Sequence, residues 1–302
     1  MMTELSNLSE GLARVVETAG ASVVGVEAGR RARGTGIVWS ADGLIVTAEH
    51  VVPHDEGIRV RLGDGRQIDA ALVGRDPTTD IAVLRVRDAA LQVPNWAEPS
   101  ALRVGNLVLA LGRPGQTVRA TLGIVSVLGD GWQTPAGGRI DRYLEADVRL
   151  YPGFSGGPLI DSAGNILGVN TAGLRRGGSL AVVSPTVRRV VEALVTHGRI
   201  RRGYLGIATQ PVRLAQAIAD RAQQRHGLLV LDVESGSPAE RGGLLLGDTL
   251  LTVAGQPVRY PEELLGVLSG DRIGTSVPAQ ILRAGAVVEL LLSVGERLRK
   301  SA

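Results

Sequence analysis

One serine lies inside a glycine-rich turn, in the segment GFSGGP at residues 153–158. A serine hydroxyl attacks a carbonyl carbon only if a base removes its proton and hydrogen-bond donors stabilise the oxyanion that forms. Glycines beside the serine allow a sharp bend, in which the amides of Gly153 and Ser155 point at one spot while the hydroxyl stays clear. The segment therefore predicts Ser155 as a nucleophile, against the alternative of an ordinary glycine-rich turn.

The nucleophile needs a base, and the chain contains four histidines. His50 follows the apolar run at residues 44–48, so a loop at a strand end can present it. His54 stands in a polar loop and is expected to be solvated, while His197 and His226 fit a linker and the end of a helix. We therefore predict His50 as the general base.

A carboxylate must fix the tautomer of that base and stabilise its imidazolium form. Asp80 stands at the start of the apolar strand expected at residues 81–85, where it would be partly buried and would need a partner. Asp76 is the competing candidate, but a residue before a proline more often begins a turn. The chain order His50, Asp80, Ser155 is that of chymotrypsin-like proteases, and it argues against an esterase with an α/β-hydrolase fold.

Short apolar runs separated by turn residues must position these side chains. The 41 glycines are spread without a period, which indicates strands joined by tight turns. Two series of such runs with little helix between them predict two six-stranded antiparallel barrels, flanked by helices at 3–19 and 188–194. The expected strands are residues 22–27, 34–39, 44–48, 58–62, 67–74 and 81–85, then 107–111, 123–127, 143–146, 158–160, 166–171 and 180–183.

The composition changes at residues 198–202, a polar stretch beside glycines that we interpret as a linker. It would join a protease domain at residues 1–197 to a second domain at 203–296, with a tail at 297–302. The second domain combines strand patterns with helical patterns at 214–226 and 261–268, so the overall fold class is mainly β with an α+β module at its C-terminal side. Its expected strands are residues 204–209, 228–233, 248–253, 276–283 and 287–294.

Residues from about 12 to 195 resemble the protease domain of the HtrA (Deg) family, trypsin-like proteins with a chymotrypsin-like double β-barrel. The resemblance is specific because its motifs occur in the family's order, at residues 34–38, 47–52, 79–84, 123–126, 153–158 and 168–172. It implies His50 as general base, Asp80 as the carboxylate that orients it, and Ser155 as nucleophile. It also implies that the amides of Gly153 and Ser155 form the oxyanion hole.

The same resemblance implies where substrate binds. Val169, Asn170 and Thr171 lie in a segment similar to the family's substrate-flanking strand. Leu150 is expected on the wall of the S1 pocket and Arg149 on the opposite side, because neighbouring residues along a strand face opposite ways. Leu150 inside the pocket would favour apolar P1 residues.

Three residues depart from the family pattern. Phe154 stands before the serine where the family usually has Asn, so the hydrogen bonds of the turn must differ locally. Arg149 and Tyr151 replace small and amide residues in the segment that leads to the serine. These departures motivate an alternative function, a catalytically weak peptide-binding or chaperone-like scaffold with the same fold.

Residues 203–296 resemble a PDZ domain of the same family, through the stretches 204–207, 227–230, 237–244, 247–251 and 253–258. Such a module binds a peptide C-terminus by adding it as a strand to a sheet edge. Tyr204, Leu205, Gly206 and Ile207 would form the loop whose backbone amides hold the peptide carboxylate. The alternative is a module that only packs against the protease.

Composition excludes several other classes. The net charge is +3, from 33 basic and 30 acidic residues, and aromatics are only 3%, so nucleic-acid binding is not expected. Arginine pairs are scattered rather than clustered, as those at 30–31, 175–176 and 201–202 illustrate. The absence of cysteine excludes disulfides and a thiol nucleophile, and we expect no metal and no cofactor.

Location and assembly are predicted less directly. The first twenty residues do not read as a signal peptide and no apolar run could span a membrane, which favours the cytoplasm for the chain as it stands. Family resemblance instead suggests an extracytoplasmic location and possible trimers. The leading hypothesis is a serine endopeptidase of protein quality control, which hydrolyses unfolded or misfolded proteins through an acyl-enzyme while its PDZ domain binds C-terminal or extended peptides.

Overall fold

The computed structural model describes residues 4–29, 32–87, 91–174, 179–201, 203–268 and 272–296. The chain forms two compact units, one of Met1–Thr134 with Arg139–Ile200 and the other of Pro135–Gly138 with Arg201–Ala302. The expected tail at 297–302 lies outside the described residues. So do the arginine pairs at 30–31 and 175–176 and the second arginine of the pair at 201–202. None of the helices in the described part of the chain has the length and apolar character to span a bilayer.

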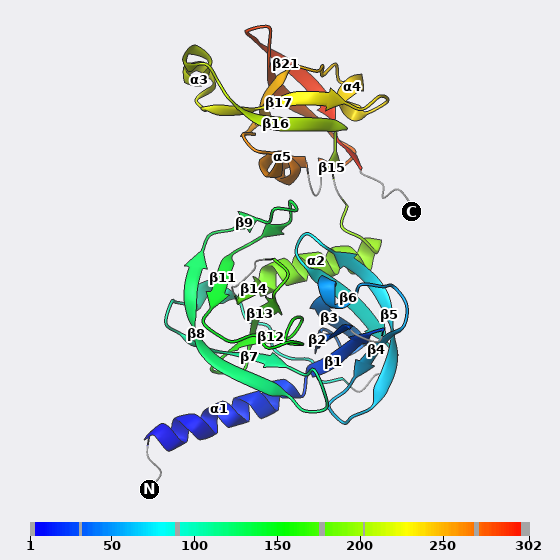
Figure 1. Ribbon diagram of the computed structural model, residues 1–302, viewed down its shortest axis with the longest axis vertical. Helices are drawn as coiled ribbons and strands as arrows, with labels where there is room; N and C mark the ends of the chain where they lie inside the picture. The colour runs from blue at the N-terminus through cyan, green and yellow to red at the C-terminus, as the bar shows by residue number, and fades with distance from the viewer. Residues whose placement is uncertain are drawn as a thin grey trace. The chain divides into compact units, whose positions relative to one another are not determined.

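The first unit contains two closed barrels, each of six antiparallel strands, as the sequence predicts (Figure 1). The first barrel has the order β1-β2-β3-β6-β5-β4. Its strands are β1 (Val23–Ala28), β2 (Ala32–Val38), β3 (Leu44–Ala48), β4 (Ile58–Arg61), β5 (Gln67–Asp76) and β6 (Ile81–Val86). Strands β3 and β6 pair with each other and are buried along nearly all their length, which suits their β-branched sequences.

The second barrel has the order β11-β14-β13-β12-β7-β8. Its strands are β7 (Leu107–Gly112), β8 (Arg119–Gly129), β11 (Tyr143–Ala146), β12 (Pro158–Asp161), β13 (Ile166–Thr171) and β14 (Leu180–Val183). Each expected barrel strand is present, but β8 begins at Arg119 rather than at residue 123, because its first residues pair with the end of β7. Between β8 and β11, the short strands β9 (Trp132–Gln133) and β10 (Arg139–Ile140) form a separate ribbon.

Two helices flank the barrels. Helix α1 (Glu4–Gly20) packs Leu12 and Val15 against the core. Helix α2 (Ser184–His197) is longer than expected, because Pro185 occupies its first turn, where a proline is favoured. It ends at Gly198, which is left-handed and donates its N–H to the Leu194 carbonyl.

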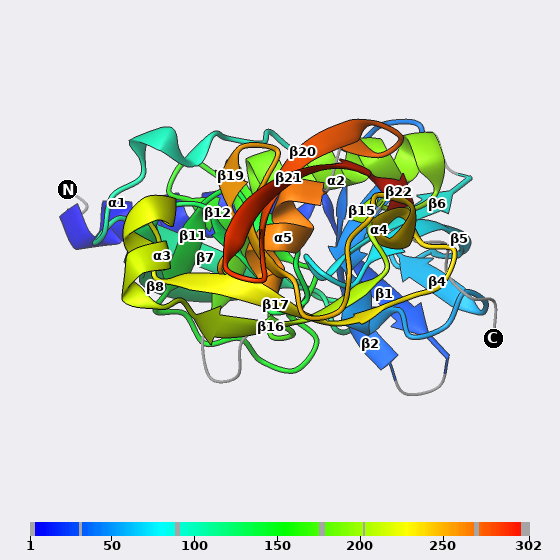
Figure 2. The same ribbon diagram turned by 90° about the horizontal axis from the view of Figure 1, so that it is seen from above.

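The second unit contains a main sheet with the order β16-β17-β18-β20-β21, in which β19 pairs with β18, and a separate pair of short strands, β15 and β22. Its strands are β15 (Gly203–Tyr204), β16 (Ile207–Arg213), β17 (His226–Val233), β18 (Thr249–Val253), β19 (Gln256–Pro257), β20 (Ser276–Arg283), β21 (Ala286–Ser293) and β22 (Gly295–Glu296). The paired strands β20 and β21 form a long hairpin, seen in orange and red in Figure 2. Strand β16 lies at an edge of the sheet, as the expected peptide-accepting strand must.

The described part of this unit also contains the helices α3 (Gln216–Ala222), α4 (Pro238–Arg241) and α5 (Pro261–Leu268). Helix α5 has the bounds that the sequence predicts. The helical pattern at 214–226 was too long, because Gln223 adopts a left-handed conformation that ends α3, and the chain then enters β17 at His226. The exposed hydrophobic Leu265 lies on α5, whereas Leu264 and Leu268 are buried in the core.

Close packing in the second barrel gives a first prediction. A Cβ on Gly123 would overlap the carbonyl of Asp147 on a neighbouring segment, so Gly123→Ala should lower the stability of the first unit by about 1–3 kcal/mol or more. The control is Gly11→Ala in exposed α1, where a Cβ meets no atom within 4 Å and helix propensity favours alanine by about 1 kcal/mol.

Calorimetry of both variants measures the unfolding transition of the first unit. The Gly123 variant is expected to melt below the parent protein and the Gly11 variant at or above it. Equal transition temperatures for the two variants would contradict the packing described for β8.

Candidate active site

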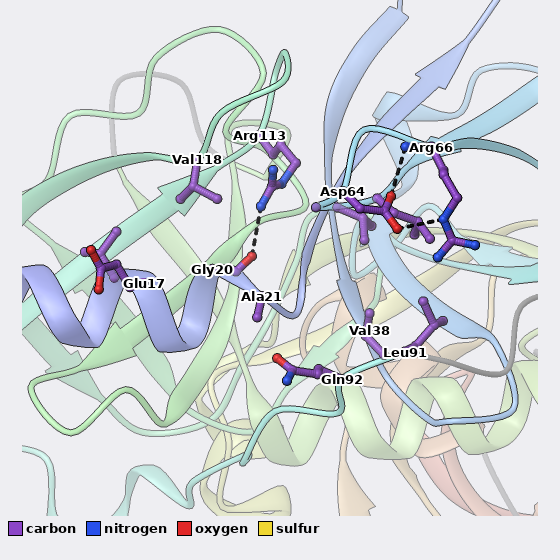
Figure 3. A pocket seen from close by; sticks show the side chains of 14 residues that line it. Glu17, Gly20, Ala21, Val38, Asp64, Arg66, Leu91, Gln92, Arg113 and Val118 are labelled. Atoms are coloured by element: carbon purple, nitrogen blue, oxygen red, sulfur yellow. Dashed lines mark hydrogen bonds and ion pairs between the residues drawn. The ribbon is translucent and has the colours of Figure 1, made fainter.

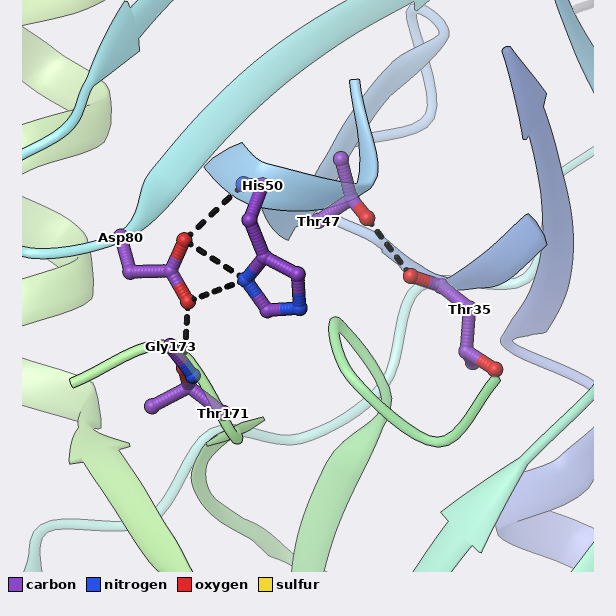
Figure 4. A network of polar contacts seen from close by, with 6 residues as sticks. All are labelled: Thr35, Thr47, His50, Asp80, Thr171 and Gly173. Carbon is purple, nitrogen blue, oxygen red and sulfur yellow. Dashed lines mark hydrogen bonds and ion pairs between the residues drawn. The ribbon is translucent and has the colours of Figure 1, made fainter. Parts of the chain in front are cut away.

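His50 and Asp80 form a hydrogen-bonded pair in the first barrel (Figure 4). The ring atom Nδ1 of His50 lies 2.9 Å from Oδ1 and 2.8 Å from Oδ2 of Asp80. His50 belongs to the 3₁₀ turn η1 (Glu49–Val51), which directly follows β3, and Asp80 directly precedes β6. Because Nδ1 faces the carboxylate, Nε2 points away from it and is the ring nitrogen available for proton transfer.

The charge of Asp80 sets the electrostatics of this pair. Its side chain is buried, and its hydrogen bond to the ring favours the imidazolium form, so the pKa of His50 is raised above 6.5. Partial burial of the imidazole opposes this effect, while the negative charges of Asp80 and Glu49 add to it. The histidine therefore binds a proton more tightly than a free imidazole does.

Backbone geometry explains why Asp80 rather than Asp76 meets the histidine. Asp76 is buried but accepts hydrogen bonds from Thr78 N, Thr78 Oγ1 and Thr79 Oγ1, so it closes the turn that precedes β6. Asp80 ends this turn with φ +56°, a left-handed conformation that is uncommon outside glycine. Its Oδ1 also accepts the His50 backbone N–H at 3.0 Å. The turn thus holds the Asp80 carboxylate against both the ring and the backbone of His50.

Two residues of the second barrel lie against the His50–Asp80 pair: Thr171 donates a hydrogen bond to it, and Gly173 leaves room for it. Thr171, at the end of β13, is buried and donates its hydroxyl proton to Oδ2 of Asp80. A Cβ on Gly173 would lie 2.8 Å from Asp80 Oδ2 and 2.9 Å from His50 Nδ1, so only glycine allows this approach. The sequence predicted Thr171 as a substrate-binding residue and did not predict these supporting roles, since nothing in the pattern shows which way a hydroxyl points.

The serine loop of the second barrel packs against the segment that carries His50. A Cβ on Gly156 would overlap Thr47 Oγ1 and would lie 2.8 Å from Ala48 N, at the end of β3. Ser155 is half-buried in this loop. Among the hydrogen bonds of the described residues, none joins His50 Nε2 to Ser155 Oγ, a bond that in proteases often tightens only in the substrate complex.

The amides predicted to form the oxyanion hole are available as donors. Across the described residues, neither the Gly153 N–H nor the Ser155 N–H donates to another protein atom. Gly153 has φ +88°, a conformation that glycine adopts without strain. The loop can therefore present both amides to a ligand oxygen.

Phe154 anchors this loop in the core of the second barrel. Its ring is fully buried, and a Cβ on Gly112 would lie 2.7 Å from it. The Phe154 N–H donates to the carbonyl of Tyr151 at 3.0 Å, and the two rings pack edge to face with centroids 5.9 Å apart. Apolar packing thus fixes the residue before the serine, in a position where the family pattern has a polar side chain.

The expected alternation of Arg149 and Leu150 assumed a strand. The segment before the serine is not a strand, so the reason given for the alternation was wrong. The two side chains nevertheless differ in environment. Leu150 is half-buried and packs against the core of the second barrel, whereas the exposed Arg149 guanidinium lies 4.8 Å from the centre of the Tyr151 ring. The position of Leu150 on an S1 wall stays a prediction.

Asn170 supports the serine loop through its backbone, and its neighbour Val169 pairs with Pro158 at the start of β12. Both side chains are buried. The Asn170 carbonyl accepts from Gly156 N at 2.9 Å, and its N–H donates to the Gly157 carbonyl at 2.8 Å. Direct contact of Val169 or Asn170 with substrate stays a prediction.

In the second unit, the predicted carboxylate loop precedes edge strand β16. Gly206 has φ +81°, and a Cβ there would lie 2.8 Å from the Tyr204 hydroxyl. Leu205 is buried, and Ile207 begins β16, where it pairs with Val233. Among the described residues, no protein acceptor receives the amide proton of Leu205 or of Gly206.

A cavity of about 560 Å³ lies between the end of α1 and the first barrel (Figure 3). Its lining includes Val16, Ala21, Leu62, Leu91, Gln92 and Arg113. None of the predicted site residues lines it.

Each of the two units matches a known protein family. Residues 34–169 match the family model of the trypsin-like peptidase domain, and residues 203–294 match that of the PDZ domain. Proteins named probable periplasmic serine endoprotease DegP-like are 34% identical in Chlamydia trachomatis and 35% identical in Pseudomonas putida, each over 268 residues and 87% of this chain. These alignments cover 54% and 56% of the two relatives, so the chain spans about half the length of the curated relatives it matches.

Solved structures match along nearly the whole chain. The HtrA-type protease AlgW with a tripeptide is 31% identical with a TM-score of 0.78, covering 96% of this chain and 98% of that one. The serine endoprotease from Yersinia pestis is 30% identical with a TM-score of 0.77, covering 95% and 98%. A double barrel followed by a PDZ sheet defines a trypsin-like protease fold with one PDZ domain. The chain belongs to the HtrA family of serine proteases.

The raised pKa of His50 gives a second prediction. The His50 imidazole should titrate above pH 6.5, and Asp80→Asn should lower the midpoint because the main stabiliser of the charged ring is lost; both are measured in a Ser155→Ala background. Since the folded-state pKa is raised, the stability from this pair is fully present below about pH 6.5 and is lost as pH rises through the folded-state pKa. Histidine NMR measures both midpoints, and an unchanged midpoint after Asp80→Asn would contradict the pairing.

Proposed function

We propose that this chain is a serine endopeptidase with His50, Asp80 and Ser155 as its catalytic triad. The observation that carries the proposal is the double contact of Asp80 with His50 beside a serine loop whose two amides have no protein acceptor among the described residues. A carboxylate that orients an imidazole prepares it to take a proton from a nucleophile, and amides without a protein acceptor can stabilise a developing oxyanion. The names of its relatives as serine endoproteases support the same activity.

The reaction follows from these positions. His50 Nε2 takes the hydroxyl proton as Ser155 Oγ bonds to the substrate carbonyl carbon, and the carbonyl oxygen becomes an oxyanion held by the amides of Gly153 and Ser155. Collapse breaks the peptide C–N bond, and His50 donates its proton to the leaving amine. Water then attacks the acyl-enzyme by the same route, which regenerates the hydroxyl of Ser155.

The substrates we propose are unfolded or misfolded proteins, in a quality-control role outside the cytoplasm. The relatives named periplasmic support this location. Leu150 would contribute to an S1 pocket for apolar P1 residues, with substrate running beside the segment 169–171. We also propose that residues 1–197 act as the protease domain and that residues 203–296 bind C-terminal or extended peptides, with trimers as the assembly suggested by the family.

Ser155→Ala should abolish hydrolysis of casein, lowering the rate by several powers of ten while leaving folding intact. The matched control is Ser40→Ala, in a turn of the first barrel where the hydroxyl donates to the neighbouring Asp42 and to no other described residue. Casein degradation and thermal unfolding are measured for both purified variants. Proteolysis that survives Ser155→Ala defeats the assignment, and peptide binding without any hydrolysis by the parent protein would favour the scaffold alternative.

The PDZ domain should bind peptides that end in a free carboxylate and an apolar residue. The adjacent amides of Leu205 and Gly206 precede the edge strand β16, so a peptide can pair with this strand while its carboxylate accepts from the loop. Affinity should be micromolar, about −8 kcal/mol, because backbone amides rather than a basic side chain hold the charge.

The full chain carrying Ser155→Ala is titrated with matched free-acid and amidated peptides. Amidation should abolish binding, since it replaces a charged acceptor with a donor-bearing group. Gly206→Val should also abolish it, because Gly206 has a positive φ and no room for a side chain beside Tyr204 and Ser237. Equal affinity for both peptide forms would show that the loop does not read the carboxylate.

A further inference from the structure

Thr35 contacts both residues of the proposed oxyanion hole. It lies in β2 of the first barrel and is fully buried. Its hydroxyl donates to the carbonyl oxygen of Gly153 at 2.6 Å, and its backbone N–H donates to the carbonyl oxygen of Ser155 at 3.0 Å. Figure 4 shows its position beside Thr47, whose hydroxyl donates to the Thr35 carbonyl at 2.7 Å.

The bond to Gly153 fixes one particular peptide plane. The peptide between Gly153 and Phe154 lies between the two peptides whose amides would bind the oxyanion. Its oxygen is held by Thr35, and its N–H is held by the carbonyl of Tyr151 at 3.0 Å. Gly153 has no side chain to limit its rotation, so after loss of the Thr35 contact only the bond from Phe154 N–H to the Tyr151 carbonyl holds this peptide plane.

The Thr35 hydroxyl is oriented by a second partner. It accepts the backbone N–H of Arg113 at 2.8 Å, so its single proton is directed to Gly153. Arg113 is itself buried, and no carboxylate pairs with its guanidinium in the described part of the chain. Backbone carbonyls hold that guanidinium instead, those of Val23 and Gln116 at 2.7 Å and that of Gly20 at 3.0 Å.

We propose that Thr35 is a positioning residue for the oxyanion hole, with the anchored amide of Arg113 as its support. The inference rests on the proposed function and adds a residue of the first barrel to the site. The hydroxyl holds the Gly153–Phe154 peptide so that the amides of Gly153 and Ser155 converge. Because those amides bind the oxyanion more strongly than the ground-state carbonyl, Thr35 acts mainly on the transition state.

The test compares Thr35→Val, which keeps the shape but lacks the hydroxyl, with Thr35→Ser, which keeps the hydroxyl. On a peptide taken from a casein cleavage site, Thr35→Val should lower kcat by about 10- to 100-fold, somewhat less than the roughly 10²- to 10³-fold loss when a whole oxyanion donor is removed. KM should change little, and the inhibition constant of a peptide boronic acid, whose tetrahedral adduct occupies the hole, should rise by a similar factor. Thr35→Ser should restore both values.

The matched control is Thr186→Val. Thr186 is buried, accepts from Asp141 N and donates to Asp141 Oδ2, so its loss also removes one donor and one acceptor. It should lower the unfolding temperature while kcat stays at the parent value. If Thr35→Val does not fold, Thr35→Ala replaces it.

A parent-like kcat in Thr35→Val, an equal loss in Thr186→Val, or a failure of Thr35→Ser to restore activity would overturn the inference. None of these outcomes affects the proposed function, provided that the parent protein hydrolyses the peptide. A parent protein that cleaves neither casein nor the peptide would refute the proposed function and this inference together.

Discussion

The buried carboxylate of Asp80 is the constraint on which the protease unit depends. Removing an ion from water costs on the order of several kcal/mol unless partners replace its hydration. Here the partners come from both barrels, since His50 bonds to it from the first and Thr171 from the second. The Asp80 carboxylate therefore has its hydrogen-bond partners only when the two barrels are in contact. Its contact with His50 also orients the imidazole and raises the pKa of that ring.

Close approach between the barrels is possible because glycines stand at the contact points. Gly173 admits the His50–Asp80 pair, and Gly156 lets the serine loop rest on the end of β3. Phe154 also fixes the loop through apolar packing in the second barrel. The site is thus held by a buried charge, by the absence of side chains where backbones touch, and by one aromatic anchor, which together leave little freedom for the groups that would react.

Most of the fold was predictable because barrel strands are short, apolar and bounded by turn residues, and because His50, Asp80 and Ser155 occur in a known order. The His50–Asp80 pair could be predicted from residue types and order, whereas the contacts that support the pair needed geometry. A hydroxyl gives no sign in the sequence of its target, so Thr35 could not be predicted to reach Gly153, 118 positions away. The helix expected at 214–226 failed for a local reason, since apolar spacing does not reveal the left-handed residue that ends α3.

The measurement that tests the central claim most directly is labelling with a fluorophosphonate, followed by mass spectrometry of the modified peptide. The probe phosphonylates only a serine whose hydroxyl is activated by a base and whose adduct is stabilised by amide donors. The account predicts a single adduct on Ser155, formed in the parent protein and lost when Asp80→Asn disorients His50. No adduct on Ser155, or one that forms equally fast in Asp80→Asn, would contradict the assignment of a working triad.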